Sequence, residues 1–122
     1  MIKFDEQKQL DSVAGALAIR KEIEGIAADV AGRGYKNICY LGIGGTYASA
    51  LQTQNHVQEY SGMEIIAQNA ALYNTTGNRR IGKDTVIVLS SVTGTTQEVV
   101  AAVEKAKAQG AVVIGFVDTA DT

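Results

Sequence analysis

The hydrophobic positions of the first 34 residues recur at helical spacing. Leu10, Val13 and Leu17 follow the three-four spacing of an amphipathic helix, and the phase shifts before a second set that begins at Ile19. We therefore expect two helices, or one kinked helix, in this segment. Gly34 favours the left-handed backbone that ends a helix, so a strand is predicted to follow it.

From residue 36 onward the pattern alternates between strands and helices. Short β-rich or apolar runs predict strands at 36–41, 63–68, 85–89 and 111–117, and helical patterns occupy 47–60 and 96–109. The polar stretch 69–83 is expected to be a surface connection with room for one helical turn near 70–73. This alternation predicts an α/β fold, a three-layer αβα sandwich around a doubly wound parallel sheet. We expect amino-terminal helices at 1–34 and a core domain at 35–122.

Composition and charge narrow the possible functions. The chain has 122 residues, 46% of them hydrophobic, which fits one globular domain. Because Cys39 and His56 are the sole cysteine and histidine, neither an internal disulfide nor a Cys/His zinc site can form, and we expect no metal and no cofactor. The net charge of −2 disfavours nucleic acid and anionic membranes as partners. An amino terminus without a signal-peptide pattern predicts a cytoplasmic protein.

Two unusual loops follow predicted strands, at 42–46 and 90–96. Ligands of open parallel sheets bind outside the carboxyl ends of the strands, where both loops are expected. The second loop places five hydroxyl residues around one glycine immediately before a helix. Hydroxyl donors and free backbone amides at a helix N-terminus favour binding of a phosphate or another anion.

Structural roles compete with ligand binding in both loops. Thr95 followed three residues later by Glu98 is typical of a capping box, which would explain these two residues by helix stability. Gly44 and Gly45 would also suit a tight turn with close packing. The cap does not account for the other hydroxyl residues of the second loop, so ligand binding remains the favoured interpretation there.

The glycine loop matches the dinucleotide fingerprint G-x-G-x-x-G incompletely. Gly42 and Gly44 fit its first two positions, but Tyr47 occupies the third. The acidic residue that should end the second strand is also misplaced, because Glu64 lies near the start of that strand. Nicotinamide or flavin binding is therefore disfavoured.

Taken together, the two loops resemble the sugar isomerase (SIS) domain family. The first carries GIGGTYAS at 42–49, and the second carries SVTGTTQE at 91–98. The second is similar to the family hallmark S-x-S-G-x-T-x-E/D, with Thr93 in place of the second serine. The resemblance covers roughly residues 19–117 and implies a flavodoxin-like sheet. Within the family the chain looks most similar to the N-terminal half of double-SIS phosphosugar isomerases and fructosamine-6-phosphate deglycases.

The resemblance implies a phosphosugar site built from both loops. The implied phosphate-binding residues are Ser91, Thr93, Gly94, Thr95 and Thr96. The implied sugar-binding residues are Gly44, Gly45, Thr46 and Glu98. No position of the sequence matches the catalytic glutamate or the ring-opening histidine of these relatives, so the catalytic residues stay unassigned.

The implied function is the phosphosugar-binding part of an aldose–ketose isomerase or of a fructosamine (amino-sugar) 6-phosphate deglycase. The alternative is a regulatory SIS module that senses a phosphosugar without catalysis. The implied partners are a phosphorylated sugar or amino-sugar and a second copy of the chain in a homodimer. SIS domains normally continue with a further helix and strand, so the sequence is expected to be truncated after its fourth strand.

Overall fold

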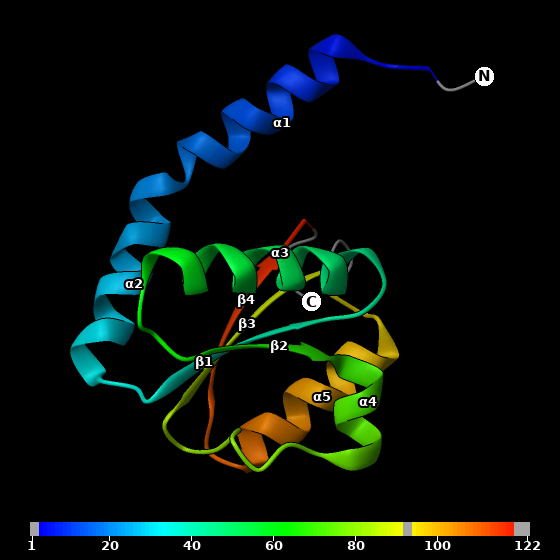
Figure 1. Ribbon diagram of the computed structural model, residues 1–122. Coiled ribbons are helices and arrows are strands. Elements are labelled where there is room, and N and C mark those ends of the chain that lie inside the picture. Colours follow the sequence, from blue (N-terminus) through cyan, green and yellow to red (C-terminus); the bar gives the residue numbers. More distant parts are fainter. Residues whose placement is uncertain (1–2, 92–93, 119–122) are drawn as a thin grey trace. The chain divides into compact units, whose positions relative to one another are not determined.

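The computed structural model describes residues 3–91 and 94–118, and the chain divides into two compact units, Met1–Gly34 and Tyr35–Thr122. The first unit consists of two consecutive helices, α1 (Glu6–Ala18) and α2 (Arg20–Arg33) (Figure 1). Their break at Ile19 confirms the predicted shift of hydrophobic phase. Neither helix contains a buried residue.

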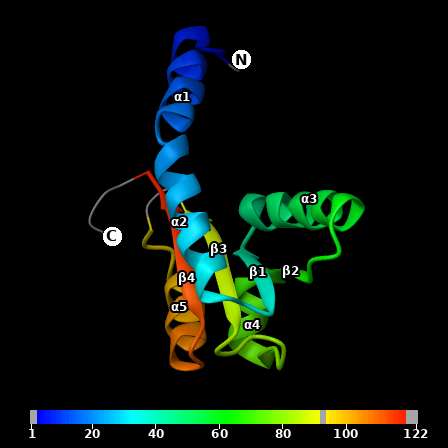
Figure 2. The same cartoon turned by 90° about the vertical axis from the view of Figure 1, so that its left-hand side faces the viewer.

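The second unit is an all-parallel sheet with helices on both faces. Its strands are β1 (Asn37–Gly42), β2 (Ile65–Asn69), β3 (Thr85–Ser91) and β4 (Val112–Val117), in the spatial order β2-β1-β3-β4. Its helices are α3 (Gly45–Tyr60), α4 (Ala70–Thr76) and α5 (Gln97–Ala108). Figures 1 and 2 show α3 on one face of the sheet and α4 with α5 on the other. The predicted α/β class and parallel sheet are confirmed.

The main hydrophobic core lies between the sheet and the α4–α5 layer. Cys39 pairs with Ile87 and Leu41 with Leu89, so these four side chains form one apolar surface across β1 and β3. The α5 residues that contact this core are small, which brings the helix close to the sheet: Val99, Ala102 and Ala106. Tyr73 of α4 completes the core as its largest fully buried side chain.

The segment expected to be a surface connection contains a longer helix than predicted. α4 begins after its N-cap residue Asn69, whose side chain accepts a hydrogen bond from the Leu72 amide (3.1 Å). It ends at Gly77, whose φ of +70° favours glycine. The hydrophobic pattern underestimates this helix because most of its residues are not buried; Ala70 and Tyr73 are its buried residues.

A buried polar network fixes the amino-terminal ends of β1 and β3. The Thr85 hydroxyl donates to the side-chain oxygen Oδ1 of Asn37 (2.7 Å). The side-chain nitrogen Nδ2 of Asn37 donates in turn to the backbone carbonyl of Arg80 (2.9 Å). The same Thr85 hydroxyl accepts from the Gly82 amide (3.0 Å). The α4–β3 connection is therefore held firmly against the sheet.

Candidate functional site

The two loops singled out in the sequence follow neighbouring strands of the sheet. β1 and β3 are adjacent and parallel, with Leu41 opposite Leu89, so the loops that follow them leave the same edge side by side. This carboxyl edge is where ligands bind in open parallel sheets.

The loop after β1 is a tight turn that brings the backbone of α3 against β1. A Cβ atom on Gly42 would lie 2.6 Å from the Thr46 carbonyl carbon and the Tyr47 nitrogen, so this position has no room for a side chain. The Thr46 hydroxyl accepts from the Ile43 amide (3.0 Å) and donates to the Ile43 carbonyl (2.9 Å). This pair of bonds directs the predicted sugar-binding hydroxyl of Thr46 into its own loop.

The two other glycines of this loop have free space around them. Gly44 has a φ of +60° and serves as the N-cap of α3, with no side chain to cap the helix. Both Gly44 and Gly45 are exposed, and a Cβ on either would meet nothing within 4 Å. The structure therefore leaves these predicted sugar-binding positions open at the carboxyl edge.

The loop after β3 is organised by Ser91. The Ser91 side chain is buried, and its hydroxyl oxygen accepts a hydrogen bond from the Gly94 amide (3.0 Å). Gly94 has a φ of +71°, a conformation that favours glycine. The structure thus brings three predicted phosphate-binding residues, Ser91, Gly94 and Thr96, to the start of α5. Thr93 lies outside the described residues.

Helix α5 begins one residue later than the predicted capping box requires. Its N-cap is Thr96, whose side chain makes no capping hydrogen bond, whereas the box would make Thr95 the cap. Glu98 lies in the first turn and is exposed, and its backbone carbonyl accepts from the Asn74 side chain (2.9 Å). Thr95 is exposed and makes contacts of its own.

Sequence reasoning missed one polar pair near the site. The Tyr40 hydroxyl lies 3.5 Å from the Ser90 hydroxyl oxygen, which joins β1 and β3 just before both loops. Both side chains are half-buried. The available signal was a tyrosine among the apolar residues of this strand. The sequence alone does not say which strand pairs with it, so its partner could not be predicted.

The electrostatics of this edge rest on backbone groups. Neither loop contains a lysine or arginine. The amino-terminal end of α5 therefore supplies the positive potential, through the helix dipole and through its first backbone amides, which have no partner inside the helix. Within the described part of the chain, no three His, Cys, Asp or Glu side chains gather as metal ligands would.

The lone cysteine belongs to the core and not to the two loops. Cys39 is fully buried in β1, and burial raises the pKa of its thiol to about 12, although the Arg80 charge opposes this shift. A thiol with such a pKa stays protonated at neutral pH and behaves as a small core side chain. The lone histidine, His56, is exposed on α3, and its ring lies 4.9 Å from that of Tyr60.

Comparison with known sequences decides the family. The sequence profile of the SIS domain matches residues 33–122, about three quarters of the chain. The chain belongs to the SIS domain family. The search of curated proteins found no match to the chain. Among its described helices, none combines the length and the apolar character needed to cross a membrane.

Solved structures share the SIS fold. A candidate phosphosugar isomerase from Salmonella typhimurium LT2 superposes with a TM-score of 0.72 at 27% identity, covering 80% of this chain and 30% of that one. The C-terminal domain of glucosamine-fructose-6-phosphate aminotransferase from Francisella tularensis gives 0.70 at 22% identity, covering 86% and 29%. Tagatose-6-phosphate ketose/aldose isomerase from Escherichia coli gives 0.67 at 17% identity, covering 88% and 30%. The SIS chain spans about a third of the length of these structures.

Proposed function

We propose that this chain is the phosphosugar-binding part of an aldose–ketose isomerase that acts on sugar or amino-sugar 6-phosphates. Membership of the SIS family supports binding of a phosphosugar. The names of two similar structures, a phosphosugar isomerase and a ketose/aldose isomerase, support the reaction. A deglycase of fructosamine 6-phosphates would share the same proton shift between adjacent sugar carbons and is the second candidate.

The observation that carries this proposal is the contact of Ser91 with Gly94. The buried Ser91 hydroxyl holds the Gly94 amide at 3.0 Å, and the left-handed backbone of Gly94 then directs the chain into α5. A phosphate bound beside Gly94 would contact the first amides of α5, which have no partner inside the helix. Because the loop contains no cation, backbone amides and hydroxyl groups would supply its hydrogen bonds.

In this scheme the chain anchors and orients the substrate. A phosphate held at 91–96 would place the sugar beside the exposed glycines Gly44 and Gly45, which leave room for a sugar ring close to the backbone. Isomerisation also needs a base within hydrogen-bond reach of the migrating proton. We assign no side chain of this chain to that role.

Thermal denaturation with ligand tests the binding step. We expect millimolar fructose 6-phosphate and glucosamine 6-phosphate to raise the melting temperature, since a ligand that binds the native state alone stabilises it. Unphosphorylated fructose should not. Ser91→Ala should abolish the shift, whereas Ser49→Ala should retain it, because the exposed Ser49 hydroxyl only bonds the Gly45 carbonyl within α3. The absence of any shift with either sugar phosphate would refute the proposal.

Turnover separates the candidate reactions. Incubation of the protein that carries this sequence with fructose 6-phosphate and with fructosamine 6-phosphate, followed by product analysis, should yield an aldose phosphate from the first. Release of the free amine from the second would identify a deglycase instead. Binding without turnover of either substrate would favour the regulatory SIS module that senses a phosphosugar.

We also propose that the chain forms a homodimer. Within the described residues β4 pairs with β3 alone, and Phe116 and Val117 at its carboxyl end are 38% and 46% exposed. An exposed apolar strand at a sheet edge favours association with another chain. Sedimentation analysis should give twice the chain mass, and a monomer at tens of micromolar would contradict this proposal.

A further inference from the structure

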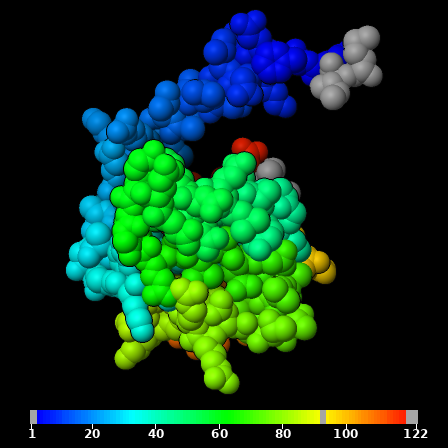
Figure 3. All heavy atoms as spheres, viewed as in Figure 1, coloured from blue at the N-terminus to red at the C-terminus, as the bar shows by residue number. Residues whose placement is uncertain are grey.

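The positive charges of the α/β unit all lie at one edge of its sheet. Topology puts them there, because they precede β1, occupy the α4–β3 connection or end α5. The six residues are Lys36, Arg79, Arg80, Lys83, Lys105 and Lys107. This is the amino edge, opposite the loops at 42–46 and 91–96. The segment that joins α4 to β3 is yellow-green in Figure 3 and forms the lower border of the unit.

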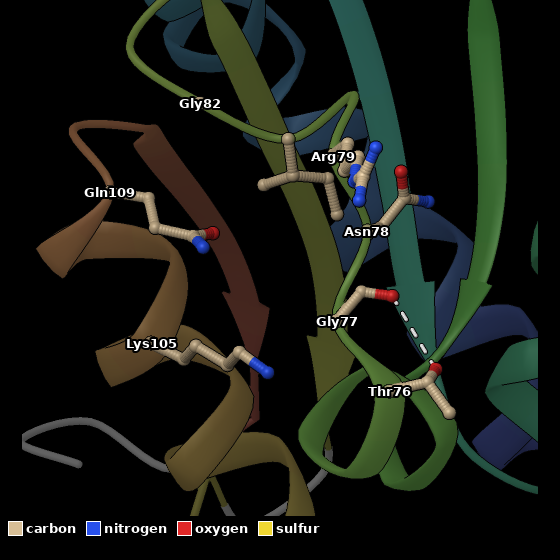
Figure 4. Close-up of a pocket in the computed structure, with 8 residues that line it drawn as sticks. Thr76, Gly77, Asn78, Arg79, Gly82, Lys105 and Gln109 are labelled. Carbon is tan, nitrogen blue, oxygen red and sulfur yellow. Dashed lines mark hydrogen bonds between the residues drawn. The ribbon is translucent and has the colours of Figure 1, made fainter.

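A cavity of about 570 Å³ opens at this edge, between the α4–β3 connection and the last turns of α5. Figure 4 shows Lys105 and Gln109 reaching into it from α5, with Arg79 on the opposite segment. Ile81 lines it as well and is itself buried, which gives the cavity an apolar floor. It is an open depression of the surface, with a volume similar to that of small-molecule sites and with a few polar groups beside its apolar lining.

Lys105 is held in place rather than extended into solvent. Its ammonium nitrogen Nζ donates to the Tyr73 carbonyl (2.8 Å) and stands 4.7 Å from the centre of the Tyr73 ring. An ammonium group has three N–H donors, so two remain for a ligand. Because the backbone contact and the ring fix the side chain, a ligand would not have to restrain it.

Gln109 and Arg79 supply the other donors. The Gln109 carbonyl oxygen Oε1 accepts from the Tyr73 hydroxyl (2.5 Å), which leaves the Nε2 amide hydrogens available. Arg79 has neither a hydrogen bond nor an ion pair with another described residue, whereas Arg80 beside it is paired with Glu64. The Arg79 guanidinium thus keeps all five donors for a ligand.

The remaining polar lining is already bonded. The Thr76 hydroxyl donates to the Leu72 carbonyl (3.0 Å), and Asn78 donates to the Gln68 side chain (2.9 Å) while accepting from the Arg80 amide. None of the described residues that line the cavity is acidic. The charged groups among these lining residues, Arg79 and Lys105, are therefore both cationic donors.

We propose that this amino-edge cavity binds a small polyanion that carries phosphate or carboxylate groups. Arg79 would bind one anionic group with its planar fork of donors, and Lys105 with Gln109 would bind another. The Tyr73 carbonyl near the end of α4 is already bonded to the Gly77 amide and to Lys105. The site is separate from the proposed phosphosugar loops, which lie at the other edge of the sheet.

A titration of the 122-residue chain followed by amide NMR shifts tests this site, with pyrophosphate in one arm and citrate in the other. We expect saturable shifts at residues 77–82 and 105–109 with at least one of the two probes. Arg79→Gln should weaken this binding about tenfold or more, since charge-assisted hydrogen bonds are lost. Because Arg79 is exposed and bonded to no other described side chain, its replacement should leave the fold intact.

Two matched variants control this experiment. Lys107→Gln also removes one positive charge, at the same end of α5 as Lys105, but Lys107 does not line the cavity. Binding should therefore weaken less than about threefold, because only a distant attraction, screened by salt, is lost. Ser91→Ala alters the opposite edge and should leave the shifts at residues 77–82 and 105–109 unchanged, whatever it does to shifts in the phosphosugar loops. Equal losses in Arg79→Gln and Lys107→Gln would overturn the proposal, as would no saturable shift with either probe. Shifts confined to 42–46 and 94–98 would also overturn it and would instead support the phosphosugar loops.

Discussion

Replacing Gly42 with alanine perturbs the closest approach between strand and helix in the site. The new Cβ would lie 2.6 Å from the Thr46 carbonyl carbon and the Tyr47 nitrogen, and 2.8 Å from the Thr46 carbonyl oxygen. Ordinary van der Waals contact begins at 3.4 Å, so the backbone must move by about 0.8 Å at the nearest atoms. All three neighbours are backbone atoms at the start of α3, so no side-chain rotation can relieve the clash.

The cost of this movement follows from how α3 is held. Ala50 is fully buried, and the helix packs on both β1 and β2, so its first turn cannot retreat without opening a gap. Overpacking a well-packed site costs about 1–3 kcal/mol, and neighbours that cannot rotate away favour the upper part of that range. We therefore expect Gly42→Ala to lower the free energy of unfolding by about 2–3 kcal/mol.

Urea denaturation measures this loss. With a slope of about 1–3 kcal/mol per molar urea for a small protein, the midpoint should fall by roughly 0.7 to 3 M. Gly62→Ala is the matched control, because a Cβ there meets nothing within 4 Å. The control should stay within about 0.5 kcal/mol of the wild type. Equal midpoints for the two variants would refute the argument that the turn needs glycine at position 42.

Three further substitutions test other parts of the unit. Thr85→Val should lower the free energy of unfolding by about 1–3 kcal/mol, because the buried Asn37 side chain loses its hydrogen-bond donor. Thr85→Ser keeps the hydroxyl and serves as the control. Equal stability of the two variants would contradict this role of Thr85. Burial raises the pKa of the Cys39 thiol from 9.0 to about 12, because the folded protein disfavours the thiolate. The contribution of this thiol to the free energy of unfolding should therefore be fully present below pH 9 and fall as the pH rises toward 12. A Cys39→Val variant should show a weaker fall over that window, and parallel curves would contradict the assignment. Gly94→Ala keeps the Ser91 hydroxyl but forces alanine to a φ of +71°, so it should reduce the fructose 6-phosphate shift, and a full shift would show that the turn is not required.

The sheet was predictable because its strands are apolar on both faces. β3 carries TVIVL, and five of its seven residues are buried, so its hydrophobic run identifies it without knowledge of its neighbours. The strand boundaries shift by one or two residues, as at β2, where Ile65 rather than Met63 begins the strand. α4 was underestimated because tertiary contacts, centred on Tyr73, hold it rather than an apolar stripe.

That the two candidate loops lie side by side was predictable for a topological reason. Hydroxyl and glycine residues follow two strands, and the crossover rules for parallel sheets place both loops at one edge. The amino-edge cavity was not predictable in this way, because it depends on side chains from α4 and α5 that meet only after packing. Lys105 illustrates this, since its nearest partner, Tyr73, is 32 residues away in the chain.

The hydroxyl groups of the two loops act on their own backbone. The Thr46 hydroxyl bonds both the amide and the carbonyl of Ile43, and the Ser91 hydroxyl oxygen accepts from the Gly94 amide. A sequence motif reveals that a hydroxyl is present, but not whether it faces a ligand or its own loop. Because these two face inward, their effect is to fix the backbone of their own loops: the Ile43 and Gly94 amides are already bonded to them and are not free to bind a ligand. In the proposed phosphate site the donors would instead be the first amides of α5, which have no partner inside the helix and would be held in position before an anion arrives.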